Sequence, residues 1–121
     1  MLGMIYEYRA TVSRVIDGDT VWLDVDLGFN VQVRLEFRLE GLNTPEIVGP
    51  QKVAGLTAKA ELARLLGLGP LRIVSTKKEK YGRYLATLYV TPTGGSEINV
   101  NEALLSQGFA KPYNGEGPKP V

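Results

Sequence analysis

An acidic turn early in the chain offers oxygen donors for a metal ion. The turn runs from Asp17 to Thr20 and precedes a segment of alternating apolar residues. Asp19 therefore stands where a strand is expected to begin, and its carboxylate is a hard donor suited to a cation such as Ca²⁺. A plain hairpin turn is the alternative, because Asp-Gly is a common turn dipeptide.

A second polar segment, from Arg38 to Glu46, follows another alternating stretch. Arg38 falls on the polar side of the predicted strand. Pro45 stiffens the loop behind it by fixing its own φ and by keeping the preceding residue out of the helical region. The loop carries three polar side chains in a short span, Asn43, Thr44 and Glu46. Such stiffness suits a preorganised site, whereas the alternative is a solvated loop with Arg38 as a surface charge.

A third segment, Lys80-Tyr81-Gly82-Arg83, places cations around an aromatic ring. This composition suits a phosphate-rich ligand, because cations contact phosphates and aromatic rings stack on bases. A solvated basic turn is the alternative interpretation. Each of the three segments is a weak signal by itself.

The composition restricts what these residues could do. The 121 residues contain no histidine and no cysteine, which excludes an imidazole base, a thiolate nucleophile and zinc-finger or iron–sulfur ligation. An enzyme of this composition must use carboxylates, arginines, lysines, hydroxyls or a hard metal ion. The net charge is +1, so any basic surface must be local.

The elements that would position these residues are mostly strands. Apolar residues alternate from Thr20 to Leu27 and again from Phe29 to Leu39, which predicts a hairpin joined through Gly28. With a first strand from Tyr8 to Ile16, the opening residues form a three-stranded meander.

Helices and further strands are predicted beyond this meander. A loop from Glu40 to Gly55 precedes a helix from Thr57 to Leu66. Its predicted apolar face consists of Leu56, Ala60, Ala63 and Leu66. Two strands, Leu71 to Thr76 and Tyr84 to Val90, and a short helix from about Val100 to Gln107 complete the order.

This order predicts a mainly β, α+β fold, a five-stranded OB-fold barrel. One helix lies between strands three and four, and a second short helix follows strand five. The domain covers residues 1–112, and residues 113–121 form a flexible tail rich in proline and glycine.

Four successive motifs resemble the staphylococcal nuclease family. They are IDGDTV from Ile16, FRLEGLNTPE from Phe37, KYGRYLA from Lys80 and VNEALLSQGFAKP from Val100. The resemblance runs in order from about Ala10 to Pro112. It implies an OB-fold nuclease that hydrolyses DNA and RNA with Ca²⁺ as cofactor, an endonuclease leaving 3′-phosphate products.

The resemblance also implies a role for individual residues. Asp19 matches the first metal carboxylate, Asn43 stands where the family commonly has a second, and Thr44 matches a residue that offers its backbone carbonyl. Glu46 matches the general base that activates water. The residues implied to contact the nucleic acid are Arg38 and Arg83 on the phosphate, Lys80 and Tyr81 on a terminal phosphate, and Tyr113 near a base.

Asn43 is the departure from the family that matters most, because an amide brings no charge to a calcium site. Glu40 could compensate for it, although a solvated strand residue is the alternative. We therefore expect weaker calcium binding and reduced activity. The alternative function is an inactive OB module that binds nucleic acid or a protein.

The partners expected are DNA or RNA, with no membrane and no obligate protein partner. A monomer is expected because no heptad pattern or exposed apolar run is evident. No signal peptide is visible, which predicts an intracellular, cytoplasmic protein unless a leader was removed.

Overall fold

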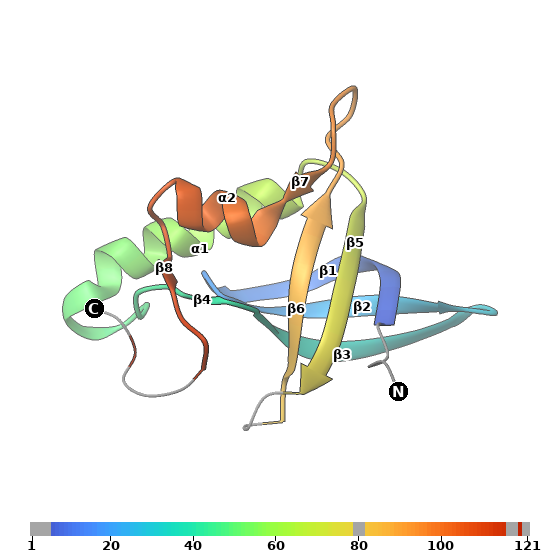
Figure 1. Cartoon of the computed structure of the whole chain (residues 1–121), viewed down its shortest axis with the longest axis horizontal. Helices are drawn as coiled ribbons and strands as arrows, with labels where there is room; N and C mark the ends of the chain where they lie inside the picture. Colours follow the sequence, from blue (N-terminus) through green and yellow to red (C-terminus); the bar gives the residue numbers. More distant parts are fainter. Residues whose placement is uncertain (1–5, 79–81, 116–118, 120–121) are drawn as a thin grey trace.

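The computed structural model describes residues 6–78, 82–115 and 119 of the chain. Within them, five strands close a barrel. They are β1 (Tyr6–Asp17), β2 (Thr20–Gly28), β3 (Val31–Leu39), β5 (Leu71–Lys78) and β6 (Tyr84–Val90). Antiparallel pairing runs in the order β3-β2-β1-β5-β6, and parallel pairing of β3 with β6 closes the ring. The predicted five-stranded OB-fold barrel is confirmed (Figure 1).

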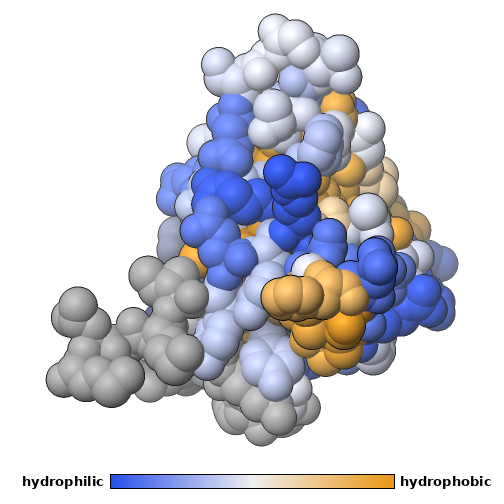
Figure 2. Space-filling model, turned by 90° about the vertical axis from the view of Figure 1, so that its right-hand side faces the viewer, coloured by the Kyte–Doolittle hydropathy of each residue, from blue (hydrophilic) through white to orange (hydrophobic). Residues whose placement is uncertain are grey.

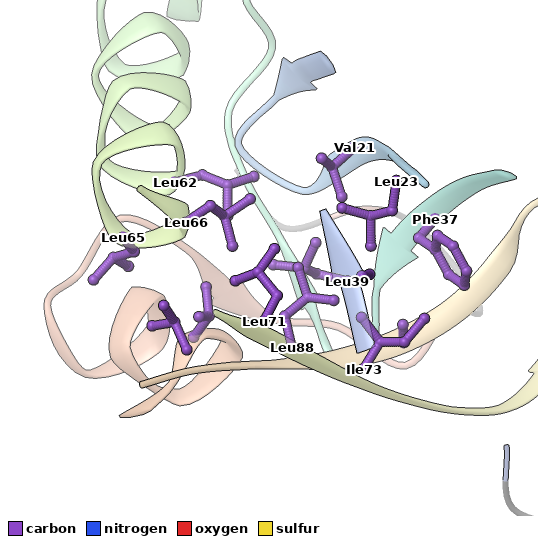
Figure 3. Close-up of a cluster of buried hydrophobic side chains, with 14 of the residues drawn as sticks. Val21, Leu23, Phe37, Leu39, Leu62, Leu65, Leu66, Leu71, Ile73 and Leu88 are labelled. Atoms are coloured by element: carbon purple, nitrogen blue, oxygen red, sulfur yellow. The ribbon is translucent and has the colours of Figure 1, made fainter. Parts of the chain in front are cut away.

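The barrel interior is filled by the alternating apolar residues that the sequence places on one face of each strand. In β2, Val21, Leu23 and Val25 are buried, while Trp22 and Asp24 between them are partly exposed. Figure 3 shows side chains from the strands and from the first helix meeting in one cluster. Removing this much apolar surface from water is the main term that holds the barrel closed.

The hairpin between β2 and β3 turns one residue later than predicted. Gly28 pairs with Val31, so Phe29 and Asn30 form a two-residue turn, and both have positive φ (56° and 61°). The predicted start of the third strand at Phe29 is therefore wrong. The alternation obscured the turn because Phe29 falls in phase with the strand, and a bulky residue rarely adopts positive φ.

This hairpin ends in exposed apolar side chains. Phe29 is 99% exposed, and Leu27 and Val31 beside it are 40% and 49% exposed. Figure 2, seen from the side on which the hairpin ends in Figure 1, shows an apolar patch surrounded by hydrophilic residues. The monomer was expected because no exposed apolar run was evident in the sequence, and this exposed tip takes away that reason. The monomeric state stays a prediction.

The helix α1 (Lys52–Leu66) follows the short 3-10 helix η1 (Gly49–Gln51) and packs against the barrel. It begins five residues before the predicted start, within the segment expected to be loop. The predicted apolar face is wrong for Leu56, Ala60 and Ala63, which are exposed. The buried residues are Gly55, Ala58, Leu62, Leu65 and Leu66. No helix in the described parts of the chain is both long and apolar enough to cross a bilayer.

The last elements lie on the same side of the barrel as α1 (Figure 1). β7 (Ile98–Asn99) pairs with β6 and leads into α2 (Val100–Ser106), whose first turn is capped by the Asn99 side chain accepting from the Glu102 N–H. β4 (Leu42–Asn43) pairs with β8 (Lys111–Pro112). This small sheet fixes the loop that follows β3, where the predicted site lies.

Candidate functional site

A buried ion pair between Asp19 and Arg38 lies at the centre of the predicted site. Asp19 precedes β2 directly and Arg38 lies near the end of β3, and the pairing of these strands sets Thr20 opposite Arg38. Arg38 Nη1 lies 3.1 Å from Asp19 Oδ2, and the two side chains are only 10% and 6% exposed. Because both charges are buried, removing either partner would leave the other charge uncompensated and would destabilise the fold.

The strand β4 brings Asn43 and Thr44 to the same ion pair. Arg38 Nη2 donates to Asn43 Oδ1 at 3.1 Å and to the Leu42 carbonyl at 3.2 Å. The Thr44 N–H donates to Asp19 Oδ2 at 3.1 Å. Four predicted site residues, Asp19, Arg38, Asn43 and Thr44, are thus brought together in one buried network.

A second carboxylate, Asp17, lies directly beside this network. Its Oδ1 accepts a hydrogen bond from the Asp19 N–H at 3.0 Å. Burial, a side-chain hydrogen bond with Asp19 and the negative charge of Asp19 raise the pKa of Asp17 to about 7, although the bond from the Asp19 N–H acts in the opposite direction. Burial also works against ionisation of Asp19, but the hydrogen bond with Asp17 and the positive charge of Arg38 outweigh it and lower the pKa of Asp19. Asp19 therefore holds the negative charge more firmly than Asp17.

The chemistry of the donors fits a hard cation. Asp19, Asn43 and Thr44, which carry carboxylate, amide, hydroxyl and carbonyl oxygens, are buried around the same ion pair. The Thr44 hydroxyl is buried without a hydrogen-bond partner among the described residues. No group of three or more carboxylates gathers in the described parts of the chain, so amide and carbonyl oxygens would have to complete such a site.

Glu46 lies two residues beyond Thr44 and is exposed, with 61% of its side chain accessible. Its Oε1 is 3.9 Å from Lys119 Nζ, a contact of little energetic weight at a solvated surface. The peptide carbonyl of Glu46 is more firmly placed, because Gly55 of α1 packs directly against it. A glycine is required there, since a Cβ at Gly55 would overlap the Glu46 carbonyl oxygen.

Replacing Gly55 with alanine is expected to destabilise the domain by about 1–3 kcal/mol, because the helix and the loop must separate to admit a methyl group. Chemical denaturation would measure this change. Gly67→Ala is the matched control at the end of the same helix, where the nearest atom to a Cβ is 3.5 Å away and φ is −85°. Equal stability of Gly55→Ala and Gly67→Ala would contradict the expectation.

Of the four remaining predicted site residues, the structure describes Arg83 and Tyr113. Arg83 is half-buried and directly precedes β6, which pairs with β3 through Leu85 and Arg38. Tyr113 donates its N–H to the Gly41 carbonyl, and its ring centroid lies 5.9 Å from Arg38 Cζ. Tyr113 thus flanks the ion pair with an aromatic face. Lys80 and Tyr81 lie outside the described residues.

The sequence profile of the family described as staphylococcal nuclease homologue matches residues 36–120. This chain belongs to that family. The match includes the segment from Arg38 to Glu46 and both helices, and it agrees with the barrel described above.

Curated relatives support the assignment. This staphylococcal nuclease homologue is 34% identical over 110 residues to the thermonuclease of Staphylococcus hyicus, covering 87% of this chain and 59% of that protein. It is 33% identical over 129 residues to an uncharacterised protein of Methanocaldococcus jannaschii, covering 88% and 59%. With the protein ParB of Escherichia coli it shares 30% over 115 residues, covering 92% and 60%. The chain therefore spans about 60% of the length of these relatives.

Two residues of this staphylococcal nuclease homologue that support the site were missed by sequence reasoning. Asp17 was seen only as part of a turn. Asn101 of α2 is buried, accepts from the Leu88 N–H and donates to the Glu40 and Ala86 carbonyls, so it ties α2 to β6 and to the residue after β3. Asn101 carries no sequence signal beyond its place near a helix start. The contacts of Asp17 with Asp19 could have been anticipated from their spacing in the turn.

Proposed function

We propose that this domain hydrolyses phosphodiester bonds of DNA or RNA in a calcium-dependent reaction that leaves 3′-phosphate products. The observation that carries the proposal is the buried Asp19–Arg38 pair, held by Asn43 and Thr44 where β3 ends. A guanidinium fixed beside oxygen donors can bind a phosphodiester and a cation in adjacent positions. Family membership supports the nuclease class.

Asp19, Asn43 and the Thr44 carbonyl are the groups proposed to hold Ca²⁺. A bound calcium ion would stabilise the negative charge that develops on the phosphate oxygens in the transition state. Asn43 contributes an oxygen without charge, and its Oδ1 is already an acceptor for Arg38. We therefore keep the expectation of weaker calcium binding than with an aspartate at this position.

The chain's own residues are proposed to hold the phosphate and to move a proton. Arg38 has five N–H donors, of which its contacts with Asp19, Leu42 and Asn43 use at most three. The other donors, with Arg83, would grip the scissile phosphate. Glu46, exposed on its stiffened loop, would take a proton from the attacking water as general base, a role that falls to a carboxylate because the chain has no histidine.

The proposed contacts to the rest of the substrate come from Lys80, Tyr81 and Tyr113. Tyr113 has structural support, because its ring lies over Arg38 and offers a stacking face next to the phosphate position. Lys80 and Tyr81 are proposed from the sequence motif alone.

A second function is favoured by one observation, the amide at Asn43. An OB module that binds nucleic acid or a protein without cutting would not need a charged calcium site. The presence of Arg38, Glu46 and Arg83 favours the enzyme over such a module.

A cleavage assay separates the two functions. Purified protein is incubated with single-stranded DNA in calcium or in chelator, alongside Glu46→Gln. Degradation that requires calcium and is lost in Glu46→Gln supports the nuclease. Gel-shift binding without degradation under any calcium concentration would support the binding module instead.

A further inference from the structure

The single tryptophan of the chain, Trp22, lies on the outer face of β2 next to the candidate site. The residues on either side of it in the strand are buried in the barrel, whereas Trp22 is partly exposed. Trp22 follows Thr20, the partner of Arg38, by two residues or about 7 Å along the strand. Residues two apart in a strand share a face, so Trp22 lies on the same face of the sheet as Arg38. This face extends along β1, β2 and β3 from β4 toward the hairpin tip (Figure 1).

A bulge in β1 brings an arginine beside this tryptophan. The pairing of β1 with β2 shifts by one residue at Ser13, and Arg14 then pairs with Trp22. Without the extra residue, Arg14 would pair with Val21, whose side chain is buried in the core. A shift of one residue exchanges the two faces of a strand. The bulge therefore places Arg14 on the outer face, where it is exposed.

Another pair of an arginine and an aromatic residue in the same barrel is already satisfied within the protein. Arg72 of β5 pairs with Tyr89 of β6, its Cζ lies 4.1 Å from the ring centroid, and it forms ion pairs with two carboxylates. Arg14, by contrast, forms no ion pair with any residue that the structure describes, and the Trp22 indole N–H donates to none of them. Arg14 and Trp22 therefore keep their charge, ring face and donor for a ligand.

The charges on the two sides of Trp22 indicate how a nucleic acid would lie on this face. Glu36 of β3 pairs with Trp22 on the side opposite Arg14. A carboxylate repels phosphate, whereas a guanidinium binds two of its oxygens at once. A strand that crosses this face would therefore run its phosphates along the β1 side and lay a base on the indole ring.

We propose that Trp22 and Arg14 form a subsite for a nucleotide next to the scissile phosphodiester, with the base stacked on the indole and its phosphate bound by Arg14. This inference rests on the proposed function for the position of the scissile phosphate. Continuity with the candidate site favours a single-stranded nucleic acid as the ligand, because a strand held at Arg38 reaches this face without leaving the sheet. Stacking also needs unpaired bases, since a base inside a duplex exposes no face.

Intrinsic fluorescence tests the stacking directly, because emission excited at the indole band comes from Trp22 alone. A labelled single-stranded DNA of about ten nucleotides is titrated in chelator, so that calcium-dependent cleavage does not consume it. A base stacked on the indole is expected to quench its emission in step with binding, which the anisotropy of the label records. Binding without any change in the emission of Trp22, or no binding at all, would overturn the subsite.

Variants of the ring measure its contribution to binding. Trp22→Leu is expected to bind the labelled strand about tenfold more weakly than the wild type, and Trp22→Phe, which keeps a ring, to recover most of the loss. Tyr89→Leu is the matched control, because it also removes a partly exposed ring from the outer face of a strand, and it is expected to bind as the wild type does. Equal affinities of Trp22→Leu and Tyr89→Leu would contradict a stacking role.

The phosphate contact has a readout that a structural role of Arg14 would not change. Arg14→Gln is expected to reduce the slope of log affinity against log salt concentration by about 0.7, the value for one phosphate contact on a single strand. Arg72→Gln removes the same charge elsewhere on the barrel and should leave the slope as it is. A slope that Arg14→Gln leaves unchanged would remove Arg14 from the subsite.

The outcomes distinguish this inference from the proposed function. Quenching in the wild type and weaker binding by Trp22→Leu, without cleavage by the wild type in calcium, would support the subsite and overturn the nuclease proposal. Cleavage by the wild type, with neither quenching nor an effect of Trp22→Leu on affinity, would overturn the subsite and leave the nuclease proposal standing.

Discussion

Replacing Arg38 with lysine is expected to slow phosphodiester cleavage about 100-fold at saturating calcium. Lysine keeps one positive charge beside Asp19 but loses the planar fork that matches two phosphate oxygens. It also replaces two nitrogens with one, whereas Nη1 of the guanidinium contacts Asp19 and Nη2 contacts Leu42 and Asn43. The rate is measured on single-stranded DNA under single-turnover conditions.

Lysine is preferred to alanine for this test because Arg38 is buried. Arg38→Ala would leave the Asp19 carboxylate buried and unpaired, a loss of about 3–5 kcal/mol that could unfold the domain. Arg34→Lys is the matched control, since Arg34 also forms a two-point contact with a strand aspartate, Asp24, but is 63% exposed and lies outside the site. A fully active Arg38→Lys would rule out the proposed grip on the phosphate.

The barrel was predictable because its strands obey a simple period. In β2, apolar residues alternate from Val21 to Leu27, and the buried positions follow that alternation as far as Val25. In β6, burial alternates through Ala86, Leu88 and Val90. The errors lie where one residue fits two patterns. Phe29 continues the strand period but occupies a turn, and Ala60 and Ala63 are apolar enough to suggest a helix face although they are exposed.

Candidate site residues were predictable where a charged or amide side chain lies near the end of a strand. The residues that hold these side chains in place were harder to predict. Arg38 and Asn43 were singled out because their types and motif are distinctive, and the structure brings them into contact. Gly55 was placed in a loop, because glycine is a poor helix former and its contact with the Glu46 carbonyl is visible only in three dimensions. Asn101 was missed for the same reason, since its partners Glu40 and Ala86 are distant in the sequence.

Replacing Asn43 with aspartate is expected to tighten calcium binding about tenfold and to lower by a similar factor the calcium concentration that gives half-maximal cleavage. The side chains have the same shape, so the bond from Arg38 Nη2 at 3.1 Å can be retained. The added carboxylate also attracts the Arg38 guanidinium, which competes with calcium for the same negative charge. Calcium still gains more, because at equal distance a divalent ion interacts with a carboxylate twice as strongly as a guanidinium does.

Titration calorimetry and a calcium series of the cleavage assay measure these two effects on one protein. Asn30→Asp is the matched control, because it adds the same charge at the exposed β2–β3 turn, at the opposite end of the molecule from β4 (Figure 1). If Asn43→Asp and Asn30→Asp bind calcium equally, the amide at position 43 does not limit the site. Tighter binding without faster cleavage at low calcium would instead place calcium away from the reacting phosphate, because an ion that stabilises the transition state must change the rate when it binds.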